Sequence, residues 1–187
     1  MKQMLLALML CLLSVSATAL ELAGAKLEDR TQVAERKLML NGAGVRSVFI
    51  LDLYVAALYL PEKQTSGAAV LADNGEKRIA LHLLRDIGAD HLSGALSKAI
   101  SANHTQSELT TLDVSLKEFN AIFHALQELK KGDAITLDYL PASGTQIGVN
   151  GVLKGTIPDP AFYRALLKIW LGDKPAQADL KQKLLGA

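Results

Sequence analysis

Residues 40–61 read LNGAGVRSVFILDLYVAALYLP, and they carry the strongest strand signals of the sequence. Residues 41–44 contain two glycines, which take positive φ at no steric cost, so this segment predicts a turn. Residues 45–60 are rich in β-branched and aromatic side chains, which predicts one long strand or two strands joined by a bend near Leu51-Asp52. Pro61 predicts the end of that strand, because proline has no N–H to donate to a ladder.

The flanking sequence predicts further strands, with helices between and after them. Asn150-Gly151 is typical of a two-residue hairpin, and Asp159-Pro160 of a helix start. Strands are predicted at 25–33, 36–40, 78–84, 134–140, 145–149 and 152–157, and helices at 67–71, 89–102, 115–131, 160–171 and 178–185. This order predicts the α+β class, with a mostly antiparallel sheet and helices packed on one face.

The helix predicted at 115–131 depends on a periodic apolar face and on two end signals. Ser115 and Glu118 fit a capping box at its start, and Gly132 follows two lysines at its end. The apolar face consists of Leu116, Phe119, Ile122, Phe123, Leu126 and Leu129.

The N-terminus predicts a signal peptide over residues 1–19. Lys2 precedes an apolar run from residue 4 to residue 15, which is too short to span a bilayer, and residues 17–19 have the small-x-small pattern of a cleavage site. Cleavage after Ala19 would leave residues 20–187 as a single domain in the periplasm or outside the cell, without a stable membrane span. There are two alternatives: the apolar run stays uncleaved as a membrane anchor, or the protein is a lipoprotein that carries its lipid on Cys11.

The composition of residues 20–187 narrows the possible functions. Cys11 is the only cysteine, so this segment can form no disulfide and offers no thiolate ligand. The chain has 20 Lys and Arg against 19 Asp and Glu, and without Lys2 the counts are 19 and 19, so the net charge of residues 20–187 is about zero. The sequence also contains no basic tract, so nucleic-acid binding is not predicted. The four histidines fit no metal-ligand spacing, so no metal is predicted. Gly42-Ala43-Gly44 lacks the third glycine of a dinucleotide fingerprint and precedes a predicted strand, so no cofactor is predicted.

Arg46 is the main candidate for a site residue. Strand alternation places Arg46 and Tyr54 on one face, if the bend allows, and Tyr59 on the other. A guanidinium beside a tyrosine hydroxyl, among apolar side chains, suits an anionic oxygen such as a carboxylate or an enolate. The alternative is an arginine at a strand end that pairs with a surface carboxylate.

Residues 40–46, LNGAGVR, followed by YVAALYL at 54–60, resemble the chalcone isomerase family, and in particular its bacterial chalcone-isomerase-like branch. Leu84-Arg85-Asp86-Ile87 and residues 162–172 are similar to it as well, in the same order. The resemblance implies an open-faced β-sandwich in which helices cover a large antiparallel sheet and the ligand lies between the two layers. Plant members cyclise chalcones without a cofactor, and other members bind fatty acids.

The resemblance places the family's arginine at Arg46 but matches its catalytic partners poorly. The isomerase threonine falls at Tyr54, and the tyrosine and asparagine fall at His91 and Lys98. The family's further serine or threonine site falls at about Asp159-Pro160, where no threonine stands. This favours an exported, non-catalytic binder of a fatty acid or another apolar carboxylate, with Arg46 and Tyr54 as its polar anchor and Tyr59 as a further candidate. The alternatives are an intramolecular lyase or isomerase in which Arg46 stabilises an enolate, and an interaction protein whose cleft is closed.

Overall fold

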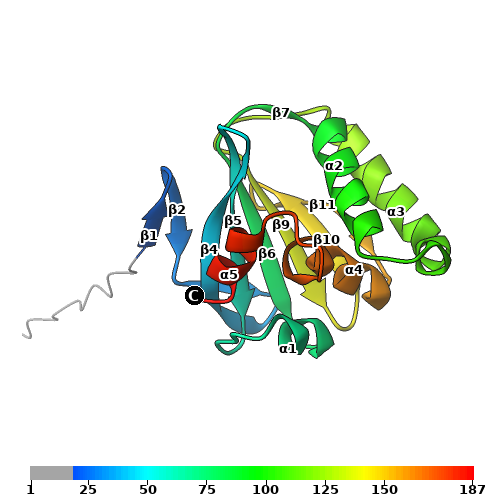
Figure 1. Ribbon diagram of the computed structural model, residues 1–187, viewed down its shortest axis with the longest axis horizontal. Helices are drawn as coiled ribbons and strands as arrows, with labels where there is room; N and C mark the ends of the chain where they lie inside the picture. The colour runs from blue at the N-terminus through cyan, green and yellow to red at the C-terminus, as the bar shows by residue number, and fades with distance from the viewer. Residues whose placement is uncertain (1–18) are drawn as a thin grey trace, which may run out of the picture.

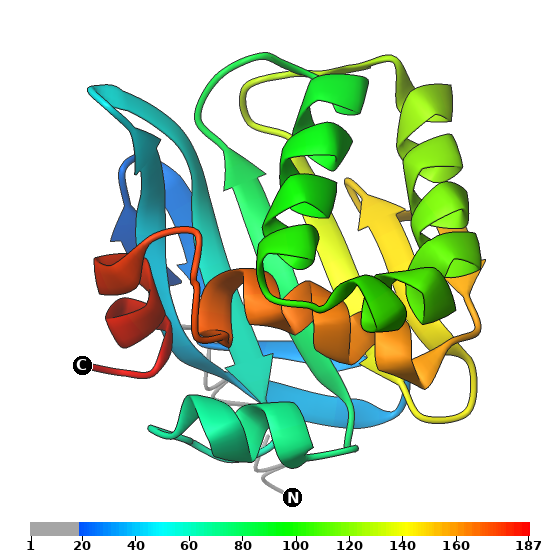
Figure 2. The same ribbon diagram turned by 45° about the vertical axis from the view of Figure 1, so that its right-hand side comes forward.

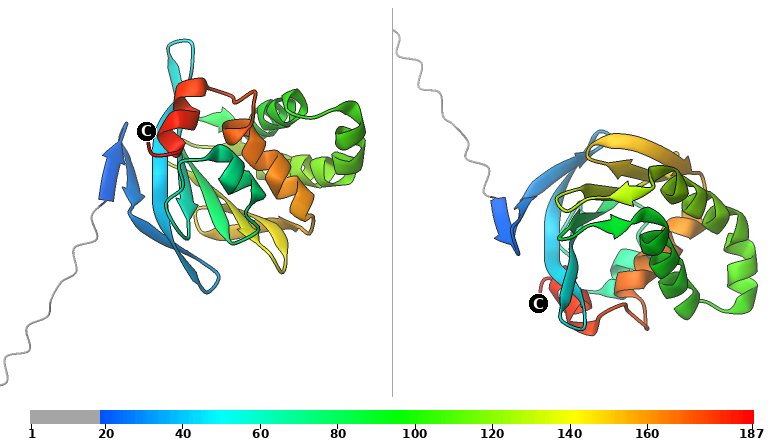
Figure 3. Two further views of the ribbon diagram at one scale, coloured as in Figure 1. Left: turned by 60° about the horizontal axis from the view of Figure 1, so that its bottom comes forward. Right: turned by 90° about the horizontal axis from the view of Figure 1, so that it is seen from above.

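A curled antiparallel sheet with helices packed against it forms the part of the chain that the computed structural model describes, residues 19–187 (Figure 1). The sheet wraps around helix α4, and α2 and α3 lie beyond it (Figure 3). This mixed architecture confirms the predicted α+β class and the sheet covered by a helix layer. The predicted signal peptide, except for its last residue, lies outside the described part.

The main sheet has seven strands in the order β11-β10-β9-β6-β5-β4-β3, and every neighbouring pair is antiparallel. Two small sheets join β1 to β2 and β7 to β8. The strands are β1 (Ala19–Leu22), β2 (Ala25–Glu28), β3 (Arg30–Val33), β4 (Arg36–Val48), β5 (Leu51–Leu60), β6 (Lys77–Leu83), β7 (Ile87–Gly88), β8 (Glu128–Leu129), β9 (Ala134–Leu140), β10 (Gly144–Val149) and β11 (Val152–Ile157).

The helices lie mostly where the periodicity predicts them. Asp159 caps α4, since its side chain accepts from the Ala161 N–H, and proline follows as expected. Asn150 and Gly151 both have positive φ, as the predicted hairpin turn requires. The helices are α1 (Gly67–Ala72), α2 (Ala89–Ala102), α3 (Gln106–Leu126), α4 (Pro160–Leu171) and α5 (Ala178–Leu184).

The turn predicted at residues 41–44 is wrong, because these residues lie inside the long strand β4. Their glycines instead let α5 approach the strand. A Cβ on Gly42 would lie 2.0 Å from the Lys183 carbonyl oxygen, and a Cβ on Gly44 would lie 2.8 Å from a Leu180 methyl carbon. The chain reverses later, at Phe49 and Ile50, so the long predicted segment is two strands.

The boundaries predicted for the second helix are also wrong. The helix begins at Gln106, where Thr105 and Glu108 form a complete capping box, while Ser115 lies inside the helix and donates to Asp159. It ends at Leu126, because Gln127 has a φ of +59° and the chain then enters β8. Two sequence patterns of the same type compete here, and the earlier one caps the helix.

Side chains of the main sheet enter two separate hydrophobic clusters. Tyr54, Ala56 and Leu58 of β5 belong to the larger cluster, which the helices cover. Val55, Ala57 and Tyr59 belong to the smaller cluster on the opposite face, together with side chains of β2 to β4. Residues 54–60 of β5 are therefore buried on both faces of the sheet, which explains their unbroken apolar sequence.

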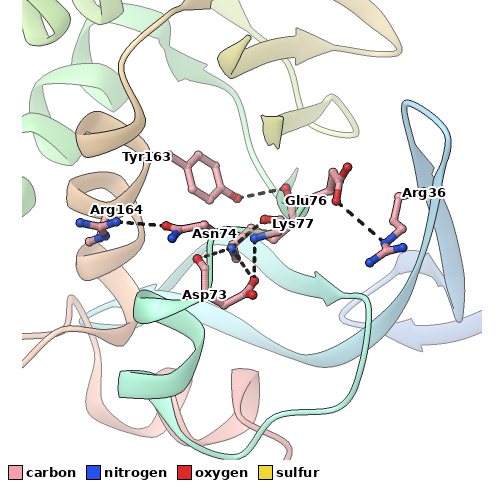
Figure 4. A network of polar contacts seen from close by, with 8 residues as sticks. Arg36, Asp73, Asn74, Glu76, Lys77, Tyr163 and Arg164 are labelled. Atoms are coloured by element: carbon pink, nitrogen blue, oxygen red, sulfur yellow. Dashed lines mark hydrogen bonds and ion pairs between the residues drawn. The ribbon is translucent and has the colours of Figure 1, made fainter. Parts of the chain in front are cut away.

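A buried lysine fastens the loop between α1 and β6 (Figure 4). The Lys77 side chain is 2% exposed; its ammonium donates to the carbonyls of Asp73 and Gly75 and lies 2.9 Å from the Asp73 carboxylate. The Tyr163 hydroxyl, 3.3 Å from the Lys77 carbonyl oxygen, ties the same strand to α4. Burial lowers the pKa of Lys77 despite the nearby Asp73 carboxylate.

Candidate functional site

A cavity of about 720 Å³ opens between the β4–β5 hairpin and helix α2. This volume lies within the range of about 300–1,000 Å³ that is usual for small-molecule sites. Its wall is mainly apolar, and its floor reaches Ile169 of α4. The lining residues are Arg46, Val48, Leu51, Leu53, Tyr54, Arg85, Asp86, Ile87, Gly88, His91, Leu92, Ala95, Leu96, Lys98, Ala99, Ala102, Ile169, Lys174, Pro175 and Ala176.

Arg46 and Tyr54 lie directly opposite each other on β4 and β5, and both line the cavity. Gln177 holds the arginine: its side-chain oxygen accepts from Arg46 Nη1 at 3.1 Å and from the Ser47 N–H at 3.0 Å, and its Nε2 donates to the Val45 carbonyl. Arg46 Nη1 also donates to the Ser47 carbonyl. Its Nε and Nη2 donate to no acceptor within residues 19–187, so they can bind an anion in the cavity.

The hydroxyl of Tyr54 is positioned by the one tryptophan of the chain. Trp170 Nε1 donates to Tyr54 Oη at 3.3 Å, and both residues are buried. Burial raises the pKa of Tyr54 above its ordinary value of 10.0, more than the Trp170 hydrogen bond and the charge of Arg46 lower it. The hydroxyl therefore keeps its proton at neutral pH and can donate it to a ligand oxygen.

Tyr59, the third residue predicted from the sequence, lies outside this cavity. It packs in the smaller cluster on the opposite face of the sheet, as strand alternation requires. Burial, together with the charge of Glu28, raises its pKa to about 12. The sheet thus separates Tyr59 from Arg46 and Tyr54, and we exclude it from the candidate site.

Basic side chains are prominent in the lining of the cavity. The cavity is lined by three basic residues apart from Arg46, here called the cationic rim: Arg85, Lys98 and Lys174. His91 and a single acid, Asp86, line it as well. Asp86 is already engaged, because it accepts from the Lys131 N–H at 2.8 Å and lies 3.3 Å from Lys130 Nζ. The cavity lining therefore has an excess of positive charge that favours an anionic ligand.

The structure shows how the positions matched to the isomerase residues are used. His91 and Lys98, on α2, face the cavity as the resemblance implies, but they bring basic groups in place of a tyrosine and an asparagine. Asp159 lies elsewhere and caps α4. Sequence reasoning missed Gln177 and Lys174, because both lie about 130 residues from Arg46 and no local pattern marks them.

Residues 19–187 contain neither a cluster of metal ligands nor a helix that could span a membrane. No three His, Cys, Asp or Glu side chains of this segment are close enough together to hold a metal ion. In the same segment, no helix has the length and hydropathy needed to span a bilayer.

The curled antiparallel sheet with a ligand-sized cavity under its helices defines a chalcone-isomerase-type fold. A fatty-acid binding protein from Arabidopsis thaliana has this fold: its crystal structure matches at a TM-score of 0.69 and 13% identity, over 90% of this chain and 96% of that chain. The family model for chalcone isomerase-like proteins matches residues 19–186, so the chain belongs to that family. No curated protein matches the sequence.

Proposed function

We propose that this protein is a non-catalytic binder of a fatty acid or a similar apolar carboxylate. The observation that carries the proposal is the Arg46 guanidinium, which Gln177 holds at the wall of an apolar cavity while Nε and Nη2 have no acceptor among the described residues. Arg46 and the Tyr54 hydroxyl would hold the carboxylate, and the apolar wall would hold the chain. The shared fold with a fatty-acid binding protein supports this proposal.

The test is palmitate binding by wild type, Arg46→Ala and the control Arg30→Ala, whose arginine is exposed on β3. A hydrogen bond to a charged group contributes about 1.5–3 kcal/mol, so Arg46→Ala should weaken binding roughly 10- to 150-fold. Palmityl alcohol, which has no charge, should bind both proteins nearly equally. Unchanged palmitate affinity, or full lipid occupancy in Arg46→Ala protein analysed by mass spectrometry, would contradict the proposal.

The alternative is an intramolecular lyase or isomerase in which Arg46 stabilises an enolate. A fixed cation in an apolar site can supply transition-state stabilisation, so the geometry permits such chemistry. His91 and Lys98 occupy the places matched to the isomerase tyrosine and asparagine, which favours the binder. Conversion of a chalcone by wild type, lost in Arg46→Ala, would favour the alternative.

We also propose that the protein belongs to the bacterial exported branch and works in the periplasm or outside the cell. The apolar run at residues 4–15 and the small residues at 17–19 support this. The intact mass of protein from fractionated cells tests it: cleavage after Ala19 gives residues 20–187, whereas a full-length chain in the cytoplasm would contradict export.

A further inference from the structure

The tip of the β4–β5 hairpin presents two large apolar side chains to solvent. Phe49 is 99% exposed and Ile50 is 94% exposed. Figure 2 shows the hairpin extending past the end of β6, so the tip stands clear of the body of the molecule. Single exposed apolar residues are normal, but an adjacent pair at a projecting tip is typical of a surface that contacts a partner.

The apolar tip continues into the cavity. Val48 and Leu51, which flank Phe49 and Ile50 in the chain, both line it, and Leu51 is also half exposed. An apolar molecule leaving the cavity toward the tip would therefore stay in contact with apolar side chains. This continuity links the tip to the source of the ligand.

The charge around the tip indicates which surface it contacts. The cationic rim lies beside the hairpin, and the connection from β6 to α2, which carries Arg85, lies at the same end of the molecule as the tip (Figures 1 and 2). Two acids lie nearby: Asp86 is paired with Lys130 at 3.3 Å, whereas Asp52 accepts, among the described residues, only from the neutral Ser47 hydroxyl at 2.6 Å and keeps its charge. The three basic groups of the cationic rim and Arg46 therefore outnumber the one nearby acid with which no cation of residues 19–187 pairs. Apolar side chains flanked by basic groups match an apolar layer beneath anionic headgroups.

We propose that the tip of the β4–β5 hairpin docks on a bilayer that contains anionic lipids. Phe49 and Ile50 insert below the headgroups, the cationic rim contacts the headgroups, and the cavity mouth opens onto the membrane. The protein thereby exchanges its apolar ligand with the bilayer without passing it through water. Docking itself does not depend on the identity of the ligand, so it can be tested apart from the proposed function.

The first experiment reports on the tip alone. Phe49→Trp and the control Val114→Trp, at a position 66% exposed on α3, are mixed with vesicles of phosphatidylcholine and phosphatidylglycerol in equal amounts. We expect the emission of Phe49→Trp to shift to shorter wavelength and to be quenched by brominated acyl chains, while Val114→Trp stays unchanged. Because Trp170 is buried, it contributes the same background to both variants. Absence of both changes in Phe49→Trp would overturn the proposal.

The second experiment measures the affinity of each protein for vesicles by flotation. Intact-mass measurement ensures that all the proteins compared have the same N-terminus. Phe49→Asn/Ile50→Ser should weaken binding at least about tenfold relative to wild type and to Val114→Ser. Asparagine suits the positive φ of 53° at position 49, so this variant should keep its fold. If the wild-type protein bound vesicles of pure phosphatidylcholine as tightly as vesicles that contain phosphatidylglycerol, the role of the cationic rim would be overturned. Vesicle-independent self-association lost in the double variant would identify a contact between copies instead.

Discussion

Replacing Gly42 by alanine should displace helix α5 from the sheet. The new Cβ would lie 2.0 Å from the Lys183 carbonyl oxygen and 2.8 Å from that of Leu184. A carbon and an oxygen that are not bonded need about 3.3 Å, so the backbone of α5 must move by roughly 1 Å. The neighbouring atoms belong to the main chain, so no side-chain rotation can relieve the contact.

The expected loss of stability follows from the leucine side chains that α5 buries against the sheet. Overpacking of a filled interior costs about 1–3 kcal/mol, and exposing Leu180 and Leu184 completely would cost about 3–6 kcal/mol. Both leucines are 0% exposed, so a partial displacement should lower the free energy of unfolding by about 2–4 kcal/mol. For a domain of this length, the melting temperature should fall by roughly 4–16 °C.

The assay is thermal unfolding by circular dichroism, with Gly94→Ala as the matched control. Gly94 is exposed within α2 and a Cβ there meets nothing within 4 Å, so alanine should stabilise the protein by about 0.5–1 kcal/mol. Gly42→Ala should also weaken palmitate binding, because Gln177 both precedes α5 and holds Arg46. A melting temperature within about 2 °C of wild type would refute this reasoning.

Three further predictions concern polar side chains that contact the interior of the protein. Asp73→Asn should lower the free energy of unfolding by about 1–3 kcal/mol, because it removes the carboxylate paired with the buried Lys77 ammonium. Lys77→Met should change it by less than about 1 kcal/mol, and urea unfolding that ranks the two variants the other way contradicts this. Burial lowers the pKa of His82 below 6.5, so its neutral ring stabilises the fold above pH 6.5 and that contribution is lost as the pH falls through the lowered pKa. The fall in melting temperature from about pH 7.5 to 5 should therefore shrink in His82→Gln, and an equal fall would count against the assignment. Tyr54→Phe should lower the free energy of unfolding by about 1–3 kcal/mol, because the Trp170 N–H loses its acceptor. The fluorescence emission of Trp170 should change as well, and unaltered emission would argue against that hydrogen bond.

The parts of the fold that the sequence predicted correctly are those with strong local signals. Asn150-Gly151 forms a turn and Asp159-Pro160 starts a helix because of the backbone preferences of these residues themselves. Neither structure depends on contacts with distant parts of the chain. The glycines at 42 and 44 mislead for the opposite reason. They are explained by the close approach of α5, which lies about 140 residues further along the chain and leaves no local pattern.

The candidate site divides in the same way. Strand alternation places Arg46 and Tyr54 together and Tyr59 apart, and the cross-strand register bears out that arrangement. Alternation says nothing about Gln177, because only tertiary packing brings the start of α5 to the edge of β4. The groups that orient Arg46 were thus out of reach of sequence reasoning, while the proximity of Arg46 and Tyr54 was not.

The two candidate functions differ in the stage at which the bound molecule carries negative charge. A carboxylate ligand is charged in its ground state, so basic side chains that line the cavity attract it from a distance and stabilise the bound state. A neutral enone gains negative charge only near its transition state, and one well-placed arginine can serve that need. Arg85, Lys98 and Lys174 line the cavity in addition to Arg46, where they act on a ligand that arrives already charged. The placement of the additional positive charge therefore favours binding over isomerisation.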